Sequence, residues 1–167
     1  MNLRRVPVLS IALLLLILLE GLSFTKNFAG AFAGISVEKK SKNFSEIAII
    51  VNPENPVSTI SSKDLKNIYK LKKNTWPTGK KIEAVNLKKR DPIRKKFSYI
   101  ILAKSASRMD KFYLKQALSG KGQPPRVLSS SGDVLDFVRY NKNAIGYIDI
   151  KEVDDSVKVL SIEDISN

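Results

Sequence analysis

The stretch EIAIIVN (residues 46–52) decides the fold class of this chain, because a β-branched run ends abruptly in NPENP (residues 52–56). A short apolar run bounded by Asn and Pro is typical of a buried strand that leaves its sheet through a turn. Comparable runs follow at KIEAVNL (residues 81–87), AIGYIDI (residues 144–150) and VKVLSI (residues 157–162). These four runs predict strands.

Amphipathic segments between these runs predict helices. The first, SSKDLKNIYKL (residues 61–71), places Ser61 as N-cap with Asp64 three residues on. Two more are expected at residues 107–118 and 131–141, the latter with Ser131 as cap. Strands that alternate with helices predict an α/β domain.

The segment RDPIRKKFSYIIL (residues 90–102) predicts a further helix with a distinctive start. Asp91 is a suitable N-cap, and Pro92 fits the first helical position, where its missing N–H costs nothing. Arg94 falls in the first turn, where it opposes the helix dipole and a docked anion would be close. An ion pair between Arg94 and Asp91 is one expectation for what favours the arginine there.

The amino-acid composition of the chain excludes several classes of function. The chain has 167 residues, 29 basic and 16 acidic, with a formal net charge of +13. Such a balance favours acidic partners or small oxyanions, although surface lysine for solubility explains it equally well. The chain has no cysteine and no histidine, which removes disulfides, the commonest metal ligand and the commonest general base near neutral pH. We therefore expect no catalytic residue, no metal site, no cofactor and no enzymatic activity.

The N-terminus has the pattern of an export signal. Arg4 and Arg5 precede an almost wholly apolar run over residues 6–19, and AFA (residues 31–33) resembles a cleavage site. Residues 1–33 are predicted to be a signal peptide, with an uncleaved membrane anchor as the alternative. Removal of this segment takes away three basic residues and one acidic residue and leaves a charge of +11.

The remaining chain is expected to hold a linker (residues 34–45) and one domain (residues 46–167) outside the cytoplasm. A nucleic-acid-binding role is not expected, because aromatic residues do not alternate with the basic ones and an exported protein rarely meets nucleic acid. Trp76, in TWPTG (residues 75–79), is expected to pin its loop to the core.

Four segments, in this order, resemble one known family: IIVNPENPVSTISSKDLKNIYKLKKNTWPTGKKI (residues 49–82), RDPIRKKF (90–97), LSGKGQPPR (118–126) and NAIGYIDI (143–150). The chain is similar to small, single-domain relatives of the phosphate ABC-transporter periplasmic substrate-binding protein. The resemblance implies a type II periplasmic binding protein-like fold, with about one lobe made of a mixed sheet flanked by helices. It further implies a periplasmic or otherwise exported location, phosphate or another small oxyanion as ligand, and an ABC transporter or another envelope protein as partner.

The chain departs from the family at the anion-binding helix start. The family has Ser-Gly-Thr there, whereas this sequence has Asp91, Pro92 and Ile93. Pro92 has no N–H to donate, Ile93 has no hydroxyl, and Asp91 repels an anion while capping the helix itself. We expect any anion to contact side chains around this helix start rather than its backbone.

Side chains that remain available for an anion are basic groups and hydroxyls. The expected ligand-binding residues are Lys88, Lys89, Arg90, Arg94, Ser58, Thr59, Ser130 and Ser131, where SSSG (residues 129–132) opens a helix. Two hypotheses stay open. Either the chain binds phosphate or another small oxyanion weakly, or it is an envelope interaction module that keeps the binding fold and has lost the ligand pocket.

Overall fold

The strand AIGYID occupies the centre of a five-stranded sheet. The computed structural model describes residues 44–163, and the strand order in the main sheet is β4-β3-β5-β1-β6. The strands are β4 (Arg126–Leu128), β3 (Glu83–Leu87), β5 (Ala144–Asp149), β1 (Ile47–Val51) and β6 (Lys158–Val159). A second, two-stranded sheet pairs β2 (Thr59–Ser61) with β7 (Ser161–Glu163).

The main sheet is mixed, as the family resemblance implied. β3 pairs in parallel with both β4 and β5, and β1 pairs antiparallel with β5 and with β6. All five residues of β1 are buried, which explains the continuous apolar run of this strand, because both of its faces are covered. Short 3₁₀ helices, η1 (Phe44–Glu46) and η2 (Ile150–Glu152), precede β1 and follow β5.

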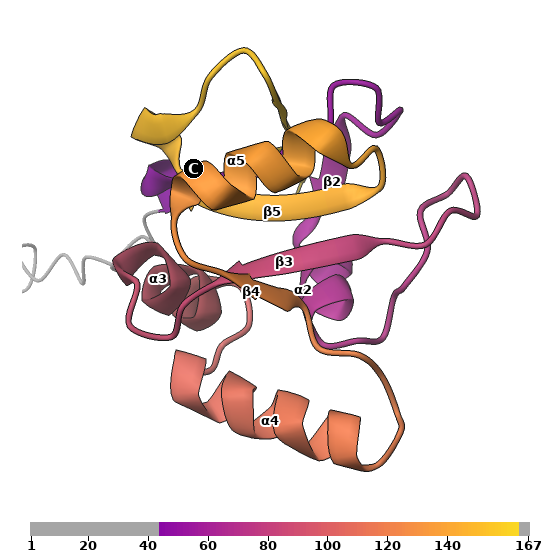
Figure 1. Cartoon of the computed structure of the whole chain (residues 1–167), viewed down its shortest axis with the longest axis vertical. Helices are drawn as coiled ribbons and strands as arrows, with labels where there is room; N and C mark the ends of the chain where they lie inside the picture. Colours follow the sequence, from indigo (N-terminus) through magenta and orange to yellow (C-terminus); the bar gives the residue numbers. More distant parts are fainter. Residues whose placement is uncertain (1–43, 164–167) are drawn as a thin grey trace, which may run out of the picture. The chain divides into compact units, whose positions relative to one another are not determined.

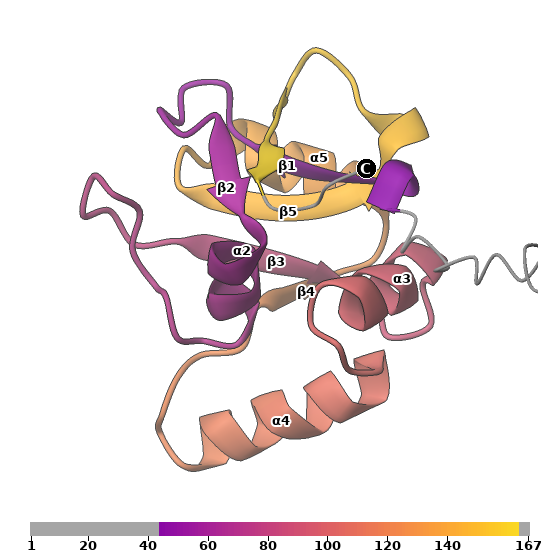
Figure 2. The same cartoon turned by 180° about the vertical axis from the view of Figure 1, so that it is seen from behind.

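Helix α5 (Ser131–Tyr140) covers one face of the sheet, and α2 (Ser62–Tyr69) covers the other (Figures 1 and 2). Gly146 in β5 permits the close approach of α5, since a Cβ there would lie 2.6 Å from Val134 Cγ1. The next residue, Tyr147, faces the opposite side, where its ring stacks on that of Phe97 with centroids 3.9 Å apart. Phe97 belongs to α3 (Pro92–Ile100), which packs beside α2 on this face.

Helix α4 (Ala106–Leu118) packs against α3 through part of its length. Its inward stripe, Ala106, Met109 and Tyr113, is buried. Leu114 and Leu118, on the outer side, are 61% and 81% exposed. The local sequence does not distinguish these two leucines from residues of the core.

The α/β prediction is confirmed, and most predicted elements lie within a few residues of their expected bounds. Two strands of three residues each, β2 and β4, were not predicted. The single strand predicted at residues 157–162 is interrupted at Leu160 and forms two strands, β6 and β7. Among the described residues, no helix is both long and apolar enough to cross a membrane. The predicted signal at residues 1–33 and nearly all of the predicted linker lie outside the described residues.

Candidate functional site

The carboxyl ends of two adjacent parallel strands bring two predicted anion-binding segments together. Leu87 at the end of β3 is in register with Leu128 at the end of β4. Each strand is followed directly by a turn and the start of a helix, α3 after β3 and α5 after β4 (Figure 1). In open α/β sheets, ligands bind outside the carboxyl ends of the parallel strands. We call this region the carboxyl edge.

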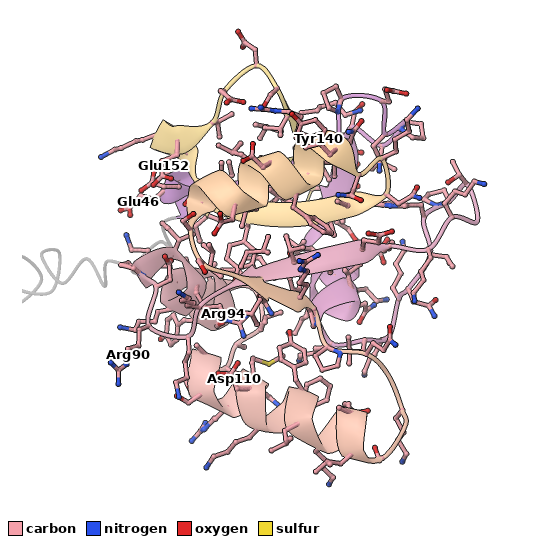
Figure 3. The ribbon with its side chains drawn as sticks, in the orientation of Figure 1. Glu46, Arg90, Arg94, Asp110, Tyr140 and Glu152 are labelled. Atoms are coloured by element: carbon pink, nitrogen blue, oxygen red, sulfur yellow. The ribbon has the colours of Figure 1, made fainter. Side chains whose placement is uncertain are left out.

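The turn after β3 supplies exposed positive charge to the carboxyl edge. Lys88, Lys89 and Arg90, here named the basic turn, are all exposed. Figure 3 shows Arg90 pointing away from the ribbon toward solvent. These three predicted site residues can therefore contact an anion from solvent. No contact within the described structure fixes the geometry of their side chains.

Helix α3 caps itself, as its sequence predicted. Asp91 Oδ1 accepts hydrogen bonds from the backbone N–H groups of Ile93 at 2.8 Å and Arg94 at 3.1 Å. With Pro92 at the first helical position, the amides at this helix start are either absent or already bonded. The backbone of α3 therefore offers no ready oxyanion site.

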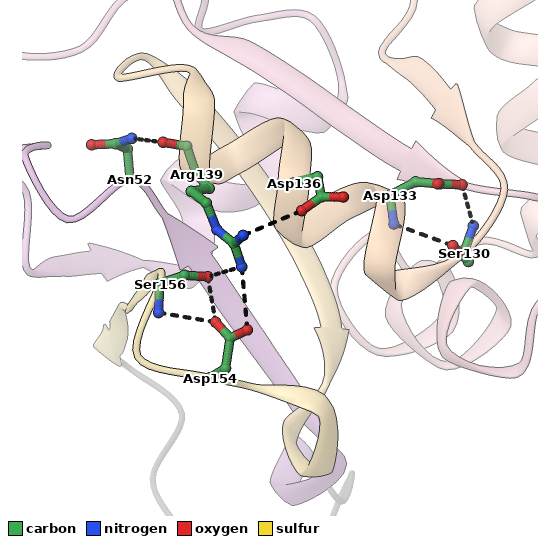
Figure 4. A network of polar contacts seen from close by, with 7 residues as sticks. All are labelled: Asn52, Ser130, Asp133, Asp136, Arg139, Asp154 and Ser156. Atoms are coloured by element: carbon green, nitrogen blue, oxygen red, sulfur yellow. Dashed lines mark hydrogen bonds and ion pairs between the residues drawn. The ribbon is translucent and has the colours of Figure 1, made fainter.

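Helix α5 caps itself in a second way that the sequence prediction missed. Ser130 Oγ accepts from the N–H of Asp133 at 3.2 Å, and Asp133 Oδ2 accepts from the N–H of Ser130 at 3.1 Å (Figure 4). Asp133 Oδ2 also accepts from the N–H of Ser129 at 3.1 Å. The cap is Ser130, not Ser131 as predicted, and Ser131 is buried at 8% exposure. The carboxylate of Asp133 thus takes the donors that an anion at SSSG would use.

Arg94 does not lie among the exposed cations. Its side chain is 1% exposed, and its partner is Asp110 of α4 rather than Asp91, with Nη2 donating to Asp110 Oδ1 at 3.1 Å (Figure 3). Nη1 donates to Asn86 Oδ1 and, at 3.4 Å, to the hydroxyl of Tyr147. The expected local ion pair with Asp91 is therefore wrong: Arg94 ties α3 to α4 and to two strands of the sheet.

The buried polar cluster around Arg94 holds its groups in fixed protonation states near neutral pH. Burial is the largest influence on Tyr147 and raises its pKa to about 12, although the nearby Arg94 acts in the opposite direction. Burial of the Arg94 guanidinium lowers its pKa, but charge interactions with Tyr147, Tyr113 and Asp110 outweigh this and raise it overall. Arg94 therefore remains a cation and Tyr147 a neutral phenol, which donates to Asn86 Oδ1 at 2.8 Å.

Ser58 and Thr59 lie apart from the carboxyl edge. Thr59 begins β2, which both views place away from α3 (Figures 1 and 2). Thr59 instead helps to line a hollow that also includes Trp76 and the ion pair between Lys73 and Asp64, at 2.5 Å. The structure does not bring these two hydroxyls together with the basic turn.

Trp76 is buried at 4% exposure and donates from Nε1 to the backbone carbonyl of Asn143 at 3.0 Å, so the prediction that it pins its loop is confirmed. Within residues 44–163, no group of three or more acidic side chains is placed to hold a metal ion. The polar partners that sequence reasoning missed are Asn86, Asp110 and Asp133. Only Asp133 had a local signal, because it stands three residues after Ser130, the spacing of a capping box.

Comparisons with solved structures find similar folds. Thirteen solved chains match. PstS from Borrelia burgdorferi aligns with a TM-score of 0.56 and 17% identity over 73% of this chain and 49% of that one. A possible phosphate binding protein from Planctomyces limnophilus aligns with a TM-score of 0.52 and 16% identity over 71% and 42%. An ABC-type phosphate transport receptor from Vibrio cholerae shares 27% identity at a TM-score of 0.49, over 71% and 46%.

No family model matches the chain, and no curated protein matches it. The chain spans less than half the length of each of these three structures. The predicted resemblance to phosphate ABC-transporter substrate-binding proteins is confirmed at the level of the fold, as is a mixed α/β sheet flanked by helices.

Proposed function

We propose that this chain is an exported, non-enzymatic, phosphate-binding-protein-like domain that binds phosphate or another small oxyanion weakly at the carboxyl edge. The observation that supports this most is the register of Leu87 with Leu128, because the basic turn and the segment Ser129–Ser131 then start from neighbouring strand ends. Basic side chains and hydroxyls are the groups that bind phosphate oxygens by charge-assisted hydrogen bonds. The neighbour from Planctomyces limnophilus is described as a possible phosphate binding protein, which supports the same ligand class.

The binding is weak in this proposal because the carboxylates of Asp91 and Asp133 already accept from the helix-start amides. An incoming anion would have to displace a like charge to reach those donors. It therefore meets flexible lysine and arginine side chains, whose ordering opposes binding.

A thermal-shift titration tests this proposal. Phosphate at about 100 times its dissociation constant should raise the free energy of unfolding by roughly 2.7 kcal/mol, with ionic strength held constant by chloride. The test variant replaces the three residues of the basic turn by glutamine and should lose the effect. A matched control removes the same charge from three exposed lysines elsewhere, Lys72, Lys80 and Lys81, and should keep it. No difference between phosphate, sulfate and chloride would refute the proposal.

A second candidate is favoured by the two self-capped helix starts. If the anion site has been replaced by the protein's own carboxylates, the domain is an envelope interaction module, with an ABC transporter or another envelope protein as partner. A photo-crosslinking residue at Lys89 should then give one discrete product in cells. The same residue at Tyr140, 77% exposed on α5, is the control, and identical products from both positions would contradict this candidate.

A further inference from the structure

Helix α4 has an outward face that combines exposed leucine with lysine. Lys111, Leu114, Lys115 and Leu118, here named the α4 outer face, line one shallow surface hollow with Ser119. Their spacing of three and four residues puts them on one side of the helix. Leu114 and Leu118 are among the most exposed large apolar side chains of the described chain. The inward stripe of α4 already provides its packing, so the fold gives no reason for leucine at these two positions.

The charge around this face has a single sign. Five basic residues lie in the segment 104–121, and all are exposed: Lys104, Arg108, Lys111, Lys115 and Lys121. The segment has one acidic residue, Asp110, and its carboxylate is paired with the buried Arg94. The α4 outer face therefore presents uncompensated positive charge around two apolar side chains.

We propose that the α4 outer face rests on an anionic lipid membrane, with the two leucines in the headgroup region and the cations against lipid phosphates. A helix with apolar residues flanked by Lys and Arg is the pattern of interfacial membrane contact. Lysine stems cover apolar surface while their ammonium groups reach the headgroups. The two leucines are far fewer than the apolar core of a specific protein interface contains, which favours a lipid surface over a protein partner.

This surface is separate from the carboxyl edge, and the inference does not depend on the proposed phosphate binding. It also differs from membrane attachment through residues 1–33, which involves no part of α4. The test must therefore report on α4 itself rather than on whether the full-length chain binds vesicles.

The absence of cysteine in the sequence makes such a test direct. In the full-length chain, Ser119→Cys places a polarity-sensitive fluorophore at the border of the α4 outer face. Vesicles of phosphatidylcholine with phosphatidylglycerol should shift its emission to the blue, and vesicles of phosphatidylcholine alone should not. The shift should weaken when salt rises from about 0.15 M to about 0.5 M. Substitution of Lys111 and Lys115 by glutamine should raise the lipid concentration at half-effect by about fivefold for each lysine.

The control is Tyr140→Cys, an exposed aromatic position on α5, on the other side of β5 from α4 (Figure 3). Its label should keep its emission in the presence of either vesicle. The proposal is overturned if position 119 shows no shift, if positions 119 and 140 shift equally, or if neutral vesicles act as well as anionic ones. A shift produced by poly-glutamate but not by anionic vesicles would assign the surface to an acidic protein instead.

Discussion

The ion pair between Arg94 and Asp110 predicts an unusual asymmetry in stability. Arg94 is buried at 1% exposure, whereas the Asp110 side chain is 43% exposed. We expect Asp110→Asn to destabilise the fold more than Arg94→Met, although asparagine is the smaller chemical change. The reason lies in the group that each substitution leaves behind.

The magnitudes follow from the contacts of each partner. Asp110→Asn leaves a buried cation without its counter-ion, which costs 3–5 kcal/mol in a fully buried pair. Because Asp110 is partly solvated and asparagine keeps an acceptor oxygen, we expect about 2–3 kcal/mol here. In Arg94→Met, water can solvate the carboxylate of Asp110, which is partly exposed. Asn86 Oδ1 still accepts a hydrogen bond from the Tyr147 hydroxyl. Arg94→Met should lower the free energy of unfolding by about 1 kcal/mol. This loss is smaller by some tenths of a kcal/mol because the substitution removes a cation from the N-terminal turn of α3.

Urea unfolding followed by circular dichroism measures these changes at neutral pH. The double variant should be no less stable than Arg94→Met alone, since the aspartate has no buried cation left to neutralise. Lys95→Met, on the exposed side of α3, is the control and should change stability by less than about 0.5 kcal/mol. Equal and small effects of the two single substitutions would show an ordinary surface ion pair and refute the reasoning.

Three further predictions concern packing and titration. Gly146→Ala should cost about 1–3 kcal/mol of unfolding free energy, since the new Cβ meets Val134 Cγ1 at 2.6 Å, while Gly132→Ala in the first turn of α5 should be neutral or stabilising in the same melts. Tyr147 has its pKa raised from 10.0 to about 12, so its contribution to stability should be lost as pH rises through that range. Tyr147→Phe should reduce the high-pH part of the tyrosinate absorbance change without removing it, because burial also raises the pKa of Tyr69 and Tyr113. Hydrogen bonds from the side chain and then the backbone of Ser156 lower the pKa of Asp154, so NMR titration should place it below the usual range, and Ser156→Ala should raise it. The stability due to Asp154 should be lost only as pH falls through that lowered value.

Local features of this chain could be predicted because their causes are local. The cap of α3 follows from the side chain of Asp91 and the ring of Pro92, and both behave as expected. The continuous burial of β1 follows from its unbroken β-branched run. By contrast, β2 and β4 have three residues each, too few to show a period, and their existence depends on the strands beside them.

The candidate site likewise has features that the local sequence predicts and features that depend on residues far apart in the chain. The basic turn could be recognised as exposed charge between a strand and a helix start. The burial of Arg94 could not, because its partners Asn86, Asp110 and Tyr147 stand on two strands and another helix. Its position in the first turn of α3 distinguishes Arg94 from Arg90, but nothing in its own neighbourhood shows that it is buried.

By itself, the sequence determined the α/β alternation, the self-capped start of α3 and the net positive charge of the chain, since each depends on neighbouring residues or on composition. Only the tertiary structure decided which cations face solvent, that the turns after β3 and β4 share one edge, and that α4 exposes two leucines among lysines. Strand order and helix packing join residues far apart in the chain, and burial is a property of that assembled arrangement rather than of any residue type.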